Sequence, residues 1–117
     1  MHNIEIWLKK FKNNWERKDV ETVLNLFHEK VIYFETPFQQ VENLGELRQE
    51  WKNIEKQKNI NLTYKIFSKD KNKYSVLWQL NYADENNNKK DFAGTYLIEL
   101  NNDGLCTYFH HACERKN

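Results

Sequence analysis

Glycine, proline and cysteine are scarce in this chain of 117 residues, which has 3 glycines, 1 proline and 2 cysteines. A flexible linker needs a stretch rich in glycine, serine or proline, so the scarcity gives no candidate domain boundary. The length is that of one ordinary domain, and we expect a single domain over residues 1–117. Cys106 and Cys113 fit no metal-ligand spacing, and we expect both to be reduced thiols.

An excess of charge of one sign is also lacking. The chain has 18 basic and 17 acidic residues, which gives a formal net charge of +1. Nucleic-acid-binding proteins usually gather a basic excess on one face, whereas these lysines are spread among acidic and amide residues. We therefore expect a solvated surface and no nucleic-acid partner.

Long apolar runs are absent, since none approaches the ~20 residues that span a bilayer. Residues 1–5 lack the basic stretch and apolar segment of a secretion signal. We therefore expect a cytoplasmic protein that does not contact membranes. Phosphate-binding loops, nucleophile elbows and zinc-protease motifs are missing too, and the sequence predicts no cofactor.

Aromatic residues, by contrast, make up 15% of the chain, which is ample material for a core. In the first half, apolar residues recur at helical spacing and predict three amphipathic helices. Asp19 is a good N-cap for the second helix, and Asn43, with Glu46 three residues later, for the third. The predicted apolar stripes run over residues 4–15, 20–27 and 44–54.

Strands are predicted from a different pattern. Residues 31–35 are β-branched and aromatic and predict a short strand that ends at Thr36-Pro37. In the second half apolar and polar residues alternate, which predicts four strands joined by turns, over residues 60–66, 74–82, 92–100 and 105–112. The fold class is therefore α+β, in the order ααβαββββ. Three N-terminal helices would cover one face of a curved antiparallel sheet.

This order resembles that of the NTF2-like superfamily, and several motifs resemble its small SnoaL-like members. The motifs are Trp15 with residues 18–20, Leu26-Phe27 before the first strand and residues 36–38 after it, Gly45 and Trp51, Trp78, and residues 94–98 running into 101–104. The resemblance implies a cone with a pocket for a small apolar ligand, and a homodimer through the outer sheet face. The last strand departs from the pattern, and implies a pocket mouth that carries imidazole.

Ketosteroid isomerases share this architecture and use an aspartate base with a tyrosine and a protonated acid as hydrogen-bond donors. The resemblance sets Thr36 at the base position, Phe11 at the tyrosine and Tyr96 near the acid. Threonine is no general base near neutral pH and phenylalanine has no hydroxyl, so we expect a different activity. Glu35 takes the base position if the alignment shifts by one residue, although such a shift reverses the face of the strand.

Glu35 and Tyr33 are the candidates on the first strand. Glu35 ends a hydrophobic strand near the expected pocket mouth, where burial would raise the pKa of a general base. The alternative is a surface glutamate paired with a lysine. Tyr33 shares its face, either as a phenol that lines the pocket or as a core tyrosine.

The second half supplies aromatic and histidine candidates. Trp51, Trp78, Tyr82 and Tyr96 suit the walls of a site for a flat or apolar ligand, although plain core packing explains them equally well. His110 and the adjacent histidine point to opposite faces of a strand, which disfavours a shared metal, and we expect no metal site. His110 is the histidine candidate for a catalytic base.

The sequence therefore favours a small-molecule pocket protein of the SnoaL-like type and leaves open whether it is an enzyme. In an enzyme, Glu35 or His110 would be the base, and Tyr33 or Tyr96 the hydrogen-bond donor. The alternative is a dimeric interaction module without turnover, whose pocket could be filled by its own side chains. A third interpretation is an accessory subunit that shields another enzyme.

Overall fold

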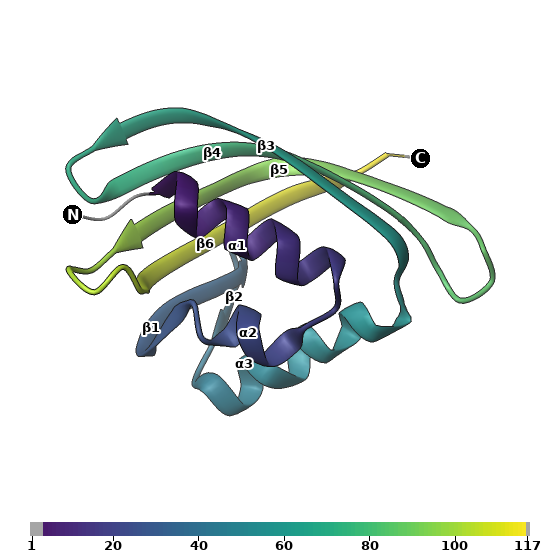
Figure 1. Ribbon diagram of the computed structural model, residues 1–117, viewed down its shortest axis with the longest axis horizontal. Coiled ribbons are helices and arrows are strands. Elements are labelled where there is room, and N and C mark those ends of the chain that lie inside the picture. The colour runs from purple at the N-terminus through teal and green to yellow at the C-terminus, as the bar shows by residue number, and fades with distance from the viewer. Residues whose placement is uncertain (1–3, 117) are drawn as a thin grey trace.

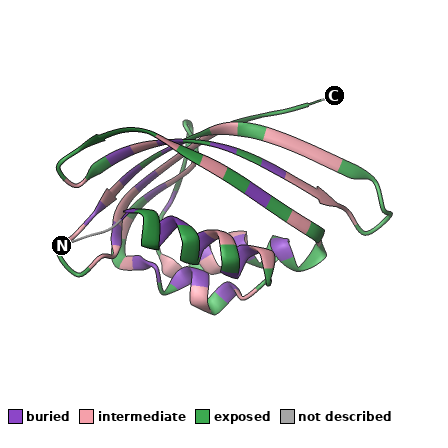
Figure 2. Ribbon diagram, turned by 45° about the horizontal axis from the view of Figure 1, so that its top comes forward, coloured by how far each residue is buried: buried purple, intermediate pink, exposed green. Residues whose placement is uncertain are grey.

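Three helices lie on the concave side of a curved sheet in the computed structural model of the chain, which describes residues 4–116 (Figure 1). The first helix, α1 (Ile4–Glu16), buries the apolar stripe that the sequence predicts, including Trp7, Phe11 and Trp15. Figure 2 shows the sheet arching over the helices, with the buried side of the helices turned toward it. The hydrophobic core therefore lies between one sheet face and the helices.

The two predicted helix caps are confirmed. The carboxylate of Asp19 accepts a hydrogen bond from the backbone N–H of Thr22 at 3.1 Å, at the start of α2 (Val20–Leu24). The side-chain oxygen of Asn43 accepts one from the backbone N–H of Glu46 at 3.0 Å, at the start of α3 (Leu44–Trp51). Each cap satisfies an N–H group that the first helical turn leaves without a partner. A short 3₁₀ helix, η1 (Lys52–Lys56), continues α3.

The second helix is shorter than the sequence predicts. It ends at Leu24, and Phe27 opens strand β1 (Phe27–Thr36) instead of closing the helical stripe. The backbone carbonyl of Leu26 accepts hydrogen bonds from the N–H of Cys106 at 2.9 Å and from the indole of Trp7 at 3.0 Å. These long-range partners draw the segment into the sheet.

The predicted meander is confirmed. Strands β3 (Lys58–Asp70), β4 (Lys73–Ala83), β5 (Lys89–Leu100) and β6 (Cys106–Arg115) pair in succession and are antiparallel. The α+β class and the element order are confirmed as well. The six-stranded sheet has the order β2-β1-β6-β5-β4-β3, in which β2 (Gln39–Val41) is a short strand that the sequence did not indicate.

One strand pair makes the sheet mixed rather than wholly antiparallel. Strand β1 runs parallel to β6, and Tyr33 lies beside Phe109. The chain leaves β1 through β2 and α3, enters the sheet again at its far edge with β3, and returns to β1 only with β6. The direction of the final strand is therefore set by the meander and not by a hairpin with β1.

Close approach of β5 and β6 depends on Gly94. A Cβ atom at this position would lie 2.0 Å from the backbone oxygen of Ala112, a distance that no side chain tolerates. Glycine thus allows the two strands to pack tightly two residues from Tyr96, which is 1% exposed. The predicted turn after β5 also forms, with Gly104 at a φ of 78°.

Candidate functional site

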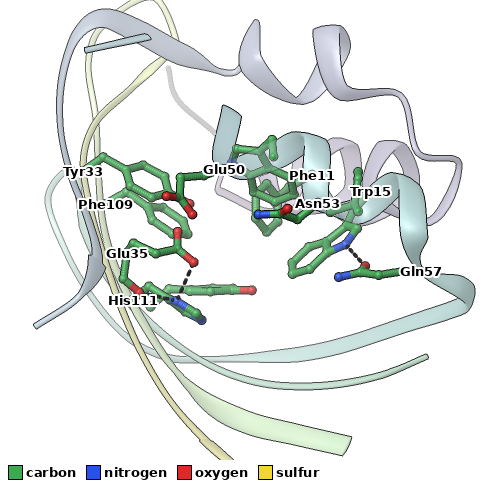
Figure 3. A pocket seen from close by; sticks show the side chains of 12 residues that line it. Phe11, Trp15, Tyr33, Glu35, Glu50, Asn53, Gln57, Phe109 and His111 are labelled. Carbon is green, nitrogen blue, oxygen red and sulfur yellow. Dashed lines mark hydrogen bonds and ion pairs between the residues drawn. The ribbon is translucent and has the colours of Figure 1, made fainter. Parts of the chain in front are cut away.

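A cavity of about 140 Å³ lies between the concave face of the sheet and the helices. Helix α1, strand β1, the segment from α3 through η1, and strands β5 and β6 all contribute side chains to its lining (Figure 3). Its walls are mostly aromatic. Phe11 lies across the ring of Tyr96 at 5.7 Å between centroids, and Tyr33 stacks on Phe109 at 4.9 Å. The cavity is thus the space that remains where these rings meet.

Three of the predicted aromatic residues line the cavity, namely Tyr33, Trp51 and Tyr96. Trp78 lies behind them and stacks on Tyr96, with 5.1 Å between ring centroids. Tyr82 lies further along β4 and stacks on Phe92 at 5.9 Å, outside the cavity lining. The structure therefore brings together the first three, and Trp78 supports one of them, Tyr96.

The two adjacent histidines lie on opposite faces of β6, as predicted, but it is His111 that lines the cavity. Its ring stacks on Trp78 at 5.2 Å between centroids. His110 lies on the outer face, where its ring packs 5.3 Å from that of Phe34. The imidazole near Glu35 is therefore that of His111.

Glu35 is a carboxylate that lines the cavity and lies near several of the other lining residues. Burial, and after it the negative charge of Glu50, raise its pKa to about 7, although a hydrogen bond from the Tyr33 hydroxyl acts in the opposite direction. Figure 3 shows Glu35, Glu50 and Tyr33 turned toward the same part of the cavity. At a pKa of about 7 the protonated and ionised forms of Glu35 are both well populated near neutral pH.

His111 is held against the backbone of Glu35. Its Nδ1 lies 2.8 Å from the Glu35 carbonyl oxygen and 4.0 Å from the carboxylate Oε1. Because a carbonyl oxygen only accepts hydrogen bonds, Nδ1 must carry the proton, which leaves a lone pair on Nε2 of the neutral ring. Burial lowers the pKa of His111, the Glu35 carbonyl opposes this, and His110 lowers the pKa further. The ring is therefore neutral at pH 7, with Nδ1 as donor.

Two tyrosine hydroxyls stand near this carboxylate. Burial raises the pKa of Tyr33 and of Tyr96 well above the ordinary value, and the charge of Glu35 raises both further. Both phenols are therefore protonated at neutral pH; Tyr33 is hydrogen-bonded to Glu35, whereas the Tyr96 hydroxyl is available as a hydrogen-bond donor. The site thus contains a carboxyl group that can gain or lose a proton near neutral pH, and beside it phenols that stay protonated.

Buried polar atoms without a partner in residues 4–116 include the hydroxyl of Tyr96 and the indole nitrogens of Trp51 and Trp78. Another lining indole is satisfied, since Trp15 Nε1 donates to the side-chain oxygen of Gln57 at 3.0 Å. Buried donors are rarely left unpaired in proteins. Two of the three, on Trp51 and Tyr96, belong to residues that line the cavity.

Several residues that line the cavity were not predicted as site residues from the sequence. They include Glu50, Gln57, Phe109 and His111. Their signals are weak, because Glu50 and Gln57 are polar residues in and after a helix and Phe109 is an ordinary core position. The part of the chain that the structure describes holds no cluster of three potential metal ligands, and none of its helices is long and apolar enough to cross a membrane.

Comparison with known proteins gives a likeness of structure only. No protein-family model and no curated protein matches the sequence. The Δ5-3-ketosteroid isomerase from Mycobacterium sp. has a TM-score of 0.81 at 14% identity, and the match covers 99% of this chain and 100% of that one. An NTF2-like protein of unknown function from Exiguobacterium sp. 255-15 has a TM-score of 0.77 at 15% identity, with 92% and 98% covered.

A protein of Mycobacterium tuberculosis in complex with estradiol-17β-hemisuccinate is similar as well, with a TM-score of 0.76 at 15% identity and coverage of 90% and 88%. Identities this low establish the fold and leave the activity open. Each of the three matches covers 90% or more of this chain, so the likeness extends over the helices and the sheet together. The chain therefore has the NTF2-like fold that its sequence resembles.

Proposed function

We propose that the protein binds a small, largely apolar molecule in the cavity and transfers a proton to or from it through Glu35. The observation that carries this proposal is the pKa of Glu35, which burial and Glu50 raise to about 7. A general acid–base group works best when its pKa lies near the operating pH. Glu35 is the lining carboxyl group with this property, beside two phenols that stay protonated.

The neighbouring residues have supporting parts in this proposal. Tyr96 donates a hydrogen bond to the ligand, Tyr33 donates one to Glu35, and Trp51 forms a wall of the site. His111 acts as a positioning residue, because its Nδ1–H holds the backbone of Glu35. His110 takes no part, since it faces the other side of the sheet.

The structural comparison supports a small-molecule site in this fold, since one similar protein is a ketosteroid isomerase and another was crystallised with a steroid derivative. The details argue against the isomerase's own set of catalytic residues. Thr36, at the base position in the resemblance, is exposed, and its hydroxyl accepts a hydrogen bond from the N–H of Phe38 at 3.2 Å. Phe11 lines the cavity without offering a hydroxyl.

Hydrogen exchange on a probe ketone tests the proposal. In heavy water, ionised Glu35 would take a proton from the carbon next to the carbonyl of cyclohexanone. The electron pair of that C–H bond forms a C=C bond while the π pair of the carbonyl moves to oxygen, and carbon then takes a deuteron from the Glu35 carboxyl group, which has exchanged with heavy water. The protein should accelerate deuterium uptake, and Glu35→Gln should abolish the acceleration while Glu29→Gln, an exposed change on the same strand, should not. Equal rates for wild type and Glu35→Gln would contradict the role of Glu35.

A dimer is supported by the outer face of the sheet. This face carries apolar side chains that are more than two-fifths exposed, flanked by aromatic rings. The exposed apolar residues are Ile32, Leu77 and Leu97, and the neighbouring rings are those of Tyr108 and His110. Large exposed apolar patches mark interaction surfaces. We propose that a second copy of the chain covers this face and that the dimer acts in the cytoplasm, where both free cysteines would stay reduced.

Native mass spectrometry tests the dimer and reports any bound ligand. Wild type should be dimeric, and Leu97→Asp should be monomeric because it places a charge in the covered face. Phe38→Asp changes a fully exposed apolar residue in the β1–β2 turn and should leave the dimer intact. A monomeric wild type would contradict the dimer. A dimer in which the aromatic side chains keep the cavity closed to every probe would favour the alternative, an interaction module without turnover.

A further inference from the structure

Two residues that line the cavity carry a hydrogen-bond donor with no acceptor in the described part of the chain. The donors are the indole N–H of Trp51 and the hydroxyl of Tyr96. Both residues are more than nine-tenths buried, with exposures of 6% and 1%. An indole nitrogen only donates, so the missing partner of Trp51 must be an acceptor. Two such donors in one small cavity point to an oxygen atom that the protein itself does not provide.

The other indoles show that the fold can satisfy such groups. Trp7 donates to the carbonyl of Leu26 at 3.0 Å, and Trp15 donates to Gln57 at the same distance. Trp51 lies near Tyr33 and lowers the pKa of that phenol against the larger effect of burial, yet within residues 4–116 its N–H has no acceptor at hydrogen-bonding geometry. The donor of Trp51 therefore lies close to the Tyr33 hydroxyl but lacks a protein acceptor at hydrogen-bonding geometry among the described residues.

Glu35 does not fill this role, although it faces the same space. Its charge acts on the hydroxyl of Tyr96, but that hydroxyl finds no hydrogen-bond acceptor among the residues described. The room between the carboxyl group and the two donors is therefore left for a ligand. An oxygen held by the donors would lie in the same cavity as the group that exchanges protons.

The volume limits the ligand. The cavity measures about 140 Å³, close to the ~150 Å³ apolar cavity that accommodates benzene and below the ~300 Å³ at which drug-sized sites begin. Its walls are fixed by mutual packing, since Trp51 meets Trp15 at 4.9 Å and Phe11 at 5.4 Å between ring centroids. A larger ligand would have to displace packed rings or leave part of itself outside, on the open side of the cavity.

From these observations we infer that the ligand is a single-ring or short-chain molecule with a carbonyl-type oxygen, which accepts hydrogen bonds from Trp51 Nε1 and the Tyr96 hydroxyl. The inference deepens the proposed function and rests on it for the cavity, but it does not depend on proton transfer. A steroid, with four fused rings, is outside this class, in contrast to the ligand of the similar Mycobacterium tuberculosis protein.

The indole N–H signals in a proton–nitrogen NMR spectrum test the inference. Cyclohexanone should move the Trp51 indole proton downfield as it becomes hydrogen-bonded, while the Trp7 signal, committed to Leu26, stays in place. Cyclohexane, which has the ring but no oxygen, should leave the Trp51 proton without a downfield shift. Tyr96→Phe should weaken cyclohexanone binding about five- to tenfold. Tyr64→Phe is the matched control, because Tyr64 lies outside the cavity lining, and should bind as wild type does.

Several outcomes would overturn the inference. They are cyclohexanone binding without a Trp51 shift, Tyr96→Phe binding as tightly as wild type, no binding of cyclohexanone, or a steroid ketone such as androstenedione binding as tightly as cyclohexanone. The signals of the other indoles show whether Tyr96→Phe is folded. If cyclohexanone binds with the Trp51 shift but its hydrogens do not exchange, the inference holds and the proposed proton transfer by Glu35 fails.

Discussion

The Nδ1 atom of His111 lies 2.8 Å from the backbone carbonyl oxygen of Glu35. This contact joins β6 to β1 across the one parallel strand pair of the sheet. It also determines which ring nitrogen carries the proton, and it places an N–H group beside a carboxylate whose pKa is about 7. The acid–base group and its positioning residue thus come from strands that are far apart in the sequence.

The first prediction concerns stability and pH. Because the pKa of Glu35 is higher in the folded state than its ordinary value of 4.5, folding favours the protonated form. Its contribution to the free energy of unfolding is present below about pH 4.5 and is lost as the pH rises through about 7. Glu35→Gln removes this loss, and above neutral pH it should be more stable than wild type by up to roughly 3 kcal/mol.

Urea unfolding at about pH 5 and about pH 8 measures this difference. The exposed Glu29→Gln change is the control and should follow wild type at both values. If Glu35→Gln is no more stable than wild type at the higher pH, Glu35 has an ordinary pKa in the folded protein.

The second prediction concerns Glu50. Its negative charge is the second cause of the raised pKa of Glu35, after burial. Glu50→Gln should therefore move the pH at which stability falls to a lower value, without removing the fall, because burial still acts. Unfolding experiments at closely spaced pH values show the midpoint. An unchanged midpoint would mean that Glu50 does not act on Glu35.

The third prediction concerns the His111 ring. Nδ1 should carry the proton at neutral pH and Nε2 should not, because Nδ1 meets a carbonyl oxygen. Its pKa should lie below the ordinary 6.5, so that stability falls only as the pH drops below that value. Imidazole nitrogen shifts measure both properties, with His28 and His110 as internal comparisons. A ring protonated at Nε2 alone would contradict the contact with Glu35.

The choice between the two histidines shows where sequence reasoning stopped. The pairing of β5 with β6 shifts by one residue at Leu100, just before the turn. A register continued from the turn without this shift sets Tyr96 opposite His110, whereas the structure sets Tyr96 opposite His111. A single bulge reverses the face of every later residue, and nothing in the local pattern indicates it.

The fold itself was largely predictable, because helix caps and alternating strands are local signals. Asp19 and Asn43 begin their helices as predicted, and the four-stranded meander forms. Strand β2 was missed because it has only three residues, which pair with the end of β1 just before it. The early end of α2 was missed because it depends on partners far away in the chain. Leu26, for example, bonds Trp7 and Cys106, and neither residue is close to it in the sequence.

The raised pKa of Glu35 can be measured from the side-chain carboxyl carbon shift of Glu35 in an NMR pH titration. We expect a midpoint near pH 7 for Glu35, because the carboxyl group is buried near Glu50. A midpoint near the ordinary value of 4.5 would show a solvated carboxylate, fully ionised at neutral pH, and would contradict its proposed role as the group that exchanges protons with the ligand.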